Sequence, residues 1–139
     1  MGKRSTASRL AMQVLYQLDI QPTSNVEELV DHTMANDSFL EETRNFTIEL
    51  VSGTWENKNE IDAVIKERSI GWSIERINNV DRSILRLSIY ELKFSDTPPS
   101  VVINEAVNLA KKFGTEDSSK FINGILGGLA DKKRVKAKD

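Results

Sequence analysis

The side chains that could support catalysis are few in this sequence of 139 residues, and their spacing brings none of them together. Cysteine is absent, which excludes thiolate chemistry and Cys-based zinc sites. The only histidine, His32, lies in an acidic segment without a second metal ligand at a suitable spacing. Adjacent carboxylates such as Glu41 and Glu42 would point about 100° apart on a helix. Since no glycine pattern of a P-loop or a dinucleotide site is present either, we expect neither an enzyme nor a site for a metal or cofactor.

Basic residues that could bind a nucleic acid gather towards the two ends of the chain. From Asp19 to Asp62 there are eleven acidic and two basic residues, a local charge of −9, and the net charge of −2 leaves +7 for the remainder. The basic residues of the ends include Lys3, Arg4, Arg9, Lys111, Lys112, Lys120 and five between Lys132 and Lys138. This asymmetry permits contacts with a phosphate backbone in spite of the net charge. The alternative is that these charges only solvate exposed helix faces.

Lys120 and Phe121 stand together where the last predicted helix begins. An aromatic ring in that position could stack on an unpaired base while the ammonium group and the helix amides meet phosphate. The spacing from Phe121 to Ile125 also fits a core position, and spacing alone favours the core.

Apolar residues recur at helical spacing in almost every segment, so we predict an all-α fold. The clearest example is Ala7, Ala11, Val14 and Leu18. We expect about seven helices in two packed helical bundles within a single domain, 1–131, with halves 1–70 and 71–131. A basic tail, 132–139, lacks apolar periodicity and is expected to fray.

Polar and glycine residues predict where several helices begin and end. Residues 36–38 offer side chains that could cap the third helix, and Asn78 or Asn79 could cap the fifth. Gly53 is expected to interrupt the third helix. Gly114 is expected to end the sixth as a left-handed residue.

The sequence has no segment typical of membrane insertion or secretion. Its longest stretch without charge, 121–130, has about half of the roughly 20 residues that cross a bilayer. No apolar segment follows the basic residues at the N-terminus. We expect a soluble, cytoplasmic protein.

Four motifs together resemble the transcription antitermination factor NusB family, and their order and spacing agree with it over almost the whole chain. They are AMQVLYQ at 11–17, VDRSILRLSIYEL at 80–92, PPSVVINEAVNLAKKFG at 98–114 and KFINGIL at 120–126. The resemblance implies an all-helical fold and a non-catalytic role. Proteins of this family bind the boxA element of ribosomal RNA leader transcripts together with NusE, which is also a small-subunit ribosomal protein. The pair makes RNA polymerase resistant to termination.

The resemblance also implies which residues act in binding. The RNA-binding residues that it implies, with Arg9 as a partial replacement, are Lys3, Arg4, Arg9, Asp117, Lys120 and Phe121. The contact with NusE maps to Tyr16 and Asp81. With this role, Phe121 is expected to be partly exposed as a platform for a base.

The N-terminal segment departs from the family's pattern, in which arginines are usual at the positions of Ser5 and Ser8 and glutamate at that of Arg9. Losing two phosphate contacts would weaken RNA binding and flatten its salt dependence, by roughly 0.7 in the slope for each phosphate. Arg9 is expected to compensate in part, turned about 100° around the helix.

Three other functions remain open. The chain could be a protein–protein adaptor with weak or lost RNA binding, as Ser5 and Ser8 suggest. The same fold also serves as an accessory domain of ribosomal RNA cytosine methyltransferases, which would require a Rossmann-type catalytic domain that these 139 residues lack. A helix-turn-helix DNA regulator is weaker, because no exposed helix face clusters base-reading side chains.

Overall fold

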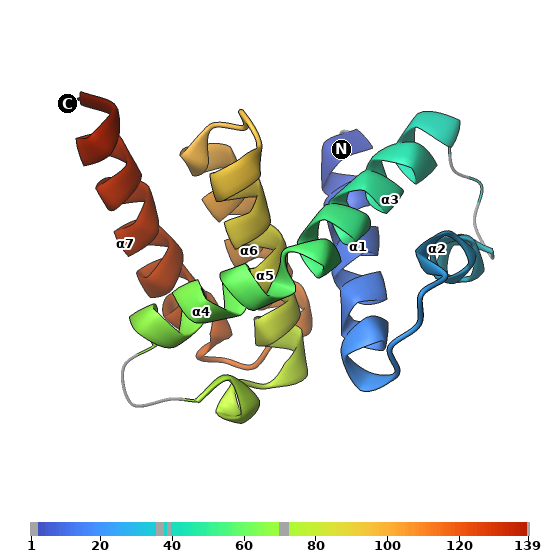
Figure 1. Cartoon of the computed structure of the whole chain (residues 1–139), viewed down its shortest axis with the longest axis horizontal. Helices are drawn as coiled ribbons and strands as arrows, with labels where there is room; N and C mark the ends of the chain where they lie inside the picture. The colour runs from blue at the N-terminus through green and yellow to red at the C-terminus, as the bar shows by residue number, and fades with distance from the viewer. Residues whose placement is uncertain (1–2, 36–37, 39, 70–72, 139) are drawn as a thin grey trace.

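The computed structural model describes residues 3–35, 38, 40–69 and 73–138, and the side chains from 4 to 130 within those ranges. Its elements are α1 (Lys3–Ile20), α2 (Val26–Met34), α3 (Glu41–Glu56), α4 (Lys58–Arg68), the short 3₁₀ helix η1 (Ile74–Arg76), α5 (Asn79–Phe94), α6 (Pro99–Phe113) and α7 (Ser118–Lys138). The described residues form no strand, which confirms the predicted all-α fold of about seven helices (Figure 1). None of the described helices has the length and apolar character needed to cross a membrane.

The caps of two helices follow from local sequence. The side chain of Asn78 accepts a hydrogen bond from the backbone amide of Asp81 at 2.9 Å, so that α5 begins with a satisfied amide, as one of the two predicted caps requires. At α2, the Asn25 side chain accepts from the amide of Glu28 at 3.1 Å in the same way.

The third helix differs from the prediction at its start. It begins at Glu41 after Leu40, whose side chain makes no capping hydrogen bond. Ser38 is therefore not its cap, and the other two residues of the predicted cap, Asn36 and Asp37, lie outside the described residues.

Gly53 does not interrupt α3, contrary to the prediction. The helix continues through it to Glu56, because glycine is tolerated in a helix where the absence of a side chain serves packing. A Cβ atom at this position would overlap the ring of Tyr90 on α5. The glycine allows α3 and α5 to approach closely.

Gly114 ends α6 as predicted, but its backbone is extended rather than left-handed, with φ −92° and ψ −168°. The reason for glycine is again space. A Cβ atom here would lie 2.7 Å from the carbonyl oxygen of Ala110 and against the side chain of Ser118. The chain can thus turn tightly from α6 into α7.

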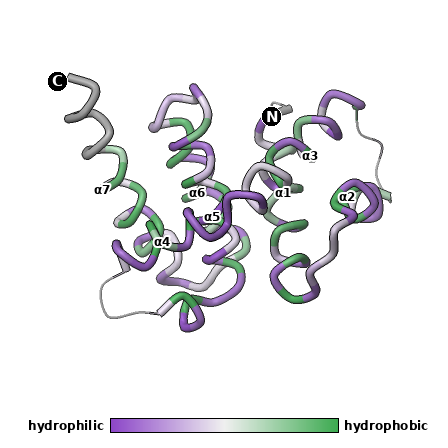
Figure 2. Tube along the Cα trace, viewed as in Figure 1, coloured by the Kyte–Doolittle hydropathy of each residue, from purple (hydrophilic) through white to green (hydrophobic). Residues whose placement is uncertain are grey.

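Helix α5 lies at the centre of the fold and packs against α1, α3, α4, α6 and α7 (Figure 1). Apolar and polar stretches alternate along the helices in Figure 2, and the buried apolar side chains pack into one core. One hydrophobic core joins residues from both sides of the expected boundary, such as Leu15 of α1 and Ile84 of α5. The division at residue 70 stays a prediction, as does fraying of 132–139, although the backbone of α7 continues to Lys138.

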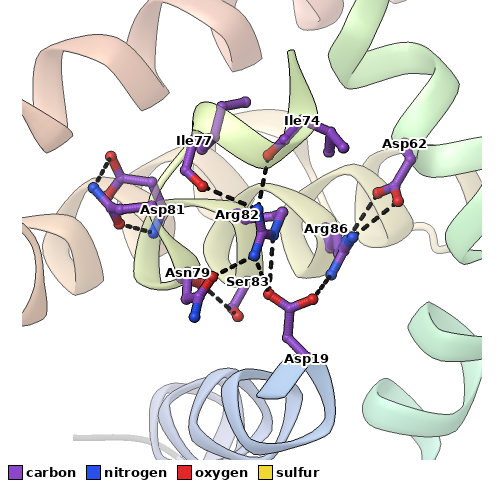
Figure 3. A network of polar contacts seen from close by, with 10 residues as sticks. Asp19, Asp62, Ile74, Ile77, Asn79, Asp81, Arg82, Ser83 and Arg86 are labelled. Carbon is purple, nitrogen blue, oxygen red and sulfur yellow. Dashed lines mark hydrogen bonds and ion pairs between the residues drawn. The ribbon is translucent and has the colours of Figure 1, made fainter. Parts of the chain in front are cut away.

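A network of ion pairs ties α5 to α1 and α4 (Figure 3). Asp19 accepts hydrogen bonds from Arg82 at 2.6 Å and from Arg86 at 2.9 Å. Arg86, which is buried, also donates to both carboxylate oxygens of Asp62 at 2.8 and 2.9 Å. Burial by itself would raise the pKa of Asp19, but the hydrogen bonds and charges of the two arginines lower it overall.

Candidate nucleic-acid interface

The first turn of α1 is anchored by Arg4. Its guanidinium donates a hydrogen bond from Nη2 to Oε2 of Glu91 on α5, and its Nε lies 3.2 Å from Oε1 of Glu105 on α6. The same group lies over the ring of Phe46 on α3, 5.7 Å from the ring centre. Arg4 therefore contacts three other helices. The backbone of Lys3 begins α1, but its side chain lies outside the described part of the chain.

Glu91 is a buried carboxylate, with only 3% of the residue exposed. Burial raises its pKa, the hydrogen bond and charge of Arg4 lower it, and the nearby charge of Glu105 raises it again, so that the pKa lies above its usual value. A buried carboxylate needs such a partner, because an unpaired charge in the interior is strongly unfavourable. The guanidinium of Arg4 is thus engaged by carboxylates of its own chain, Glu91 and Glu105.

A groove of about 270 Å³ lies between the first half of α1 and the second half of α6. Its lining residues are Ser5, Thr6, Ser8, Arg9, Glu105, Asn108, Leu109 and Lys112. Arg9, a predicted RNA-binding residue, thus faces the same hollow as Lys112 from the opposite helix. The Nη1 of Arg9 is 3.4 Å from Oε1 of Gln13.

A second hollow, of about 240 Å³, lies where α7 begins. It is lined by Arg76, Ile77, Asn78, Asp81, Thr115, Asp117, Ser118 and Phe121. Phe121 is half-buried against the core, and Asp117 and Lys120 beside it are exposed. An aromatic face next to exposed polar groups is suited to stacking on a base.

Asp81 was predicted to contact a protein partner, yet it is 95% buried and lines the same hollow as Phe121. Burial raises its pKa, which hydrogen bonds from Ser118 and Asn78 lower only in part. Its Oδ2 accepts from the Asn78 side chain at 3.3 Å. Asp81 therefore contributes to the start of α5 as well as to this hollow.

Tyr16, the other residue predicted to contact a partner, is half-buried in a third hollow of about 390 Å³. The lining residues are Met12, Gln13, Tyr16, Gln17, Thr33, Val80 and Phe113. Val80 precedes Asp81 directly, so the hollows of Tyr16 and Phe121 lie on either side of the start of α5. The structure thus places residues predicted for RNA and for a partner next to one another.

The predicted RNA-binding residues do not form a single cluster. Figure 1 shows the first turn of α1 at the top of the view and the start of α7 at the bottom. Arg4 and Phe121 accordingly belong to different regions. The groove of Arg9 and Lys112 lies between α1 and α6, and α6 leads from it to Thr115 in the hollow of Phe121.

Several residues that line these hollows were not among the predicted site residues. Asn108 lines the groove, and the exposed Arg76 lines the hollow at α7. Lys112 was noted in the sequence as a basic residue but not as part of the site. Its helical spacing from Asn108 was the one signal available, since i and i+4 share a helix face.

The model of the NusB family matches residues 5–131. The chain belongs to the NusB family. This is the family that the sequence motifs indicated, and its curated members are transcription antitermination proteins. Membership confirms the prediction of a transcription factor that is not an enzyme.

The most similar curated relatives found include the transcription antitermination protein NusB of Bacillus cereus (strain B4264), which is 45% identical over 130 residues. The match covers 93% of this chain and 98% of that protein. The protein of the same name from Bacillus mycoides (strain KBAB4) has the same identity and coverage.

Solved structures share the fold. NusB of T. maritima is 31% identical with a TM-score of 0.85, covering 94% of this chain and 92% of that one. NusB in a crystal structure of antitermination factors NusB and NusE with double-stranded RNA is 30% identical, with a TM-score of 0.84 and coverages of 95% and 98%. NusB from Aquifex aeolicus is 31% identical with a TM-score of 0.80, covering all of this chain and 94% of that one.

Proposed function

We propose that this antitermination factor binds the boxA element of ribosomal RNA leader transcripts together with NusE, and that the assembly makes RNA polymerase resistant to termination in the cytoplasm. The observation that carries the proposal is the hollow at α7, which the half-buried ring of Phe121 lines together with the exposed Asp117. Lys120, which precedes Phe121 in the chain, is exposed. A relative of the same fold has been crystallised with NusE and RNA, which supports both partners. That RNA is double-stranded, whereas stacking on Phe121 requires an unpaired base.

In this proposal each predicted site residue has a separate role. Phe121 stacks on a base, Lys120 and Lys3 meet phosphate, and Asp117 borders the base. Tyr16 receives NusE in the hollow that it shares with Val80 and Phe113. Asp81 stabilises the start of α5 between the hollow of Tyr16 and the hollow of Phe121. It contributes to NusE binding indirectly, because it fixes the position of the neighbouring Val80.

Replacing Phe121 by alanine tests the RNA site. Loss of base stacking is expected to weaken binding of boxA RNA by about 1–3 kcal/mol, which is roughly 5- to 150-fold in Kd. Lys120→Ala is expected to weaken it less, through one phosphate contact. Phe94→Ala is the matched control, because Phe94 is an exposed aromatic residue at the far end of α5.

Binding of NusE by the same variants separates this function from a pure adaptor. RNA affinity should fall for Phe121→Ala and Lys120→Ala while NusE affinity is retained. Unchanged RNA affinity with intact NusE binding would instead favour a protein–protein adaptor. Circular dichroism and thermal unfolding show whether each variant keeps its fold.

A further inference from the structure

A hollow of about 500 Å³ lies between the start of α2 and the C-terminal part of α3. Its lining residues are Thr23, Ser24, Asn25, Val26, Glu27, Ile48, Ser52, Trp55 and Glu56. The volume is in the range of ligand-binding sites in proteins, about 300–1,000 Å³. None of these residues lines the hollow of Phe121 or that of Tyr16. A molecule bound here would therefore contact residues other than those proposed for RNA and NusE.

The charged side chains that line this hollow are both acidic. Glu27 and Glu56 are exposed, and neither forms an ion pair with another described residue. The charge of Arg44 acts on Glu27, but Arg44 makes its own ion pair with Asp31, at 2.6 Å. Among the described residues, no lysine, arginine or histidine lines the hollow. The hollow is therefore suited to a cationic ligand and unsuited to a phosphate backbone.

The ring of Trp55 is already in contact with a cation. The ammonium group of Lys58 lies 5.0 Å from the ring centre, and tryptophan is the strongest aromatic partner of a cation. Trp55 is half-buried against the core, which fixes the position of its ring. The hollow thus combines an aromatic ring that attracts cations with two carboxylates, a combination suited to the side chain of arginine or lysine.

Hydroxyl groups of the lining can bind the backbone of a peptide. The side chains of Ser24 and Ser52 form no hydrogen bond within the described part of the chain. The Thr23 hydroxyl accepts from the backbone amide of Asn25 at 3.2 Å, so its own O–H can still donate. These groups can meet the N–H and C=O groups of an extended peptide, which need partners when they are covered. A metal ion is not favoured, because no group of potential ligands among the described residues could hold one.

We propose that the hollow between α2 and α3 docks a basic segment of a protein partner, with an arginine or lysine side chain at the ring of Trp55 and the carboxylates of Glu27 and Glu56. Charge complementarity identifies the occupant, because the lining offers two carboxylates and no described cation. An apolar helix would leave these carboxylates unpaired, and RNA would be repelled by them. The docking site goes beyond the proposed binding of RNA and NusE.

Binding of a fluorescein-labelled peptide of alternating arginine and glycine residues, followed by fluorescence anisotropy, tests the docking site. Glu27→Gln, Glu56→Gln and Trp55→Leu are each expected to weaken binding about 2- to 5-fold, through the loss of one charge or one cation–π contact. Glu41→Gln is the matched control, because Glu41 is an exposed carboxylate at the other end of α3. Equal losses in Glu41→Gln and Glu56→Gln would overturn the site, since they would show only a diffuse attraction to acidic helices. Failure of the wild type to bind the peptide would overturn it as well.

Lys58→Gln provides a test of opposite sign. The substitution removes the ammonium group from the ring of Trp55, so that the cation of the peptide meets no competitor there. Peptide binding is expected to become about 2-fold tighter. Weaker binding by Lys58→Gln would contradict a cationic occupant at Trp55.

The basic residues near the C-terminus of the chain itself are the alternative occupant. They are neutralised together in a variant that carries glutamine at Lys132, Lys133, Arg134, Lys136 and Lys138. This variant is expected to bind the peptide as tightly as the wild type. Tighter binding would identify the chain's own basic residues as the occupant and overturn the assignment to a partner. These measurements involve neither RNA nor NusE, so a failure of the docking site is distinguishable from a failure of the proposed function.

Discussion

Arg4 and Glu91 are 87 positions apart in sequence, and their side chains form an ion pair between the first turn of α1 and the buried side of α5. Arg4 is 30% exposed and Glu91 only 4% exposed at the side chain, so the pair sits at the edge of the core. An arginine that the sequence indicated for RNA is thus engaged by two carboxylates of its own chain. We therefore expect replacement of Arg4 to affect the free energy of unfolding more than the number of phosphate contacts with RNA.

Arg4→Met should destabilise the protein, because it removes the partner of the buried Glu91 carboxylate. The expected loss is about 1–3 kcal/mol in the free energy of unfolding, measured with urea at neutral pH. Arg76→Met, at an exposed arginine of η1, is the control and should change little. A similar loss in both variants would argue against the anchoring role of Arg4.

The stability difference between the wild type and Glu91→Gln should depend on pH. Burial raises the pKa of Glu91 in the folded protein above its ordinary value of 4.5. The stability that the protonated carboxyl contributes is therefore complete below pH 4.5 and is lost as pH rises through the raised pKa. Urea unfolding should show that the free energy of unfolding of the wild type falls relative to that of Glu91→Gln as the pH rises from acid to neutral. A difference that grows in favour of the wild type would contradict the raised pKa.

The stability difference between the wild type and Asp19→Asn should depend on pH in the opposite direction. The pKa of Asp19 is lowered in the folded protein because the hydrogen bonds of Arg82 and Arg86 outweigh burial. Its contribution is present above the ordinary value of 3.8 and is lost as pH falls through the lowered pKa. The wild type should exceed the variant by about 1–3 kcal/mol at neutral pH, and this advantage should shrink in acid. An advantage that is independent of pH would exclude an ionic role.

Gly53→Ala should destabilise the protein by about 1–3 kcal/mol, because the added Cβ atom overlaps the ring of Tyr90 and forces α3 and α5 apart. Gly124→Ala is a matched control on α7, where the added carbon would meet no atom within 4 Å apart from its chain neighbours and the backbone of its own helix. That substitution should stabilise the helix by about 0.5–1 kcal/mol. Thermal unfolding of both variants measures the contrast, and equal shifts would mean that Gly53 is not needed for the approach of the helices.

The sequence predicted the helical fold because each helix has a continuous apolar face, as in the stripe through Ala11 and Leu18. It could not predict the role of Gly53, since the contact with Tyr90 joins helices that are distant along the chain. The ion-pair partners of Arg4 could not be predicted either, because they too are distant from it along the chain. Glu91 and Glu105 belong to motifs that indicate the family, but nothing in their spacing shows that they face α1.

The sequence predicted individual residues of the candidate site but not how they are arranged in space. The juxtaposition of Lys120 and Phe121 is local and could be seen in the sequence. The burial of Asp81 beside Phe121 depends on how α7 packs against α5, as does the separation of Arg4 from Phe121. That Arg9 and Lys112 line the same groove likewise depends on the packing of α1 against α6.

Recognition of boxA RNA in the presence of NusE is the most direct test of the proposed function. The protein and NusE are titrated with boxA RNA and with a scrambled RNA of the same length and composition, at two salt concentrations. Phosphate contacts are common to both RNAs, so only base recognition can separate their affinities. We predict tighter binding of boxA RNA at both salt concentrations. Equal affinity for the scrambled RNA would contradict sequence-specific recognition.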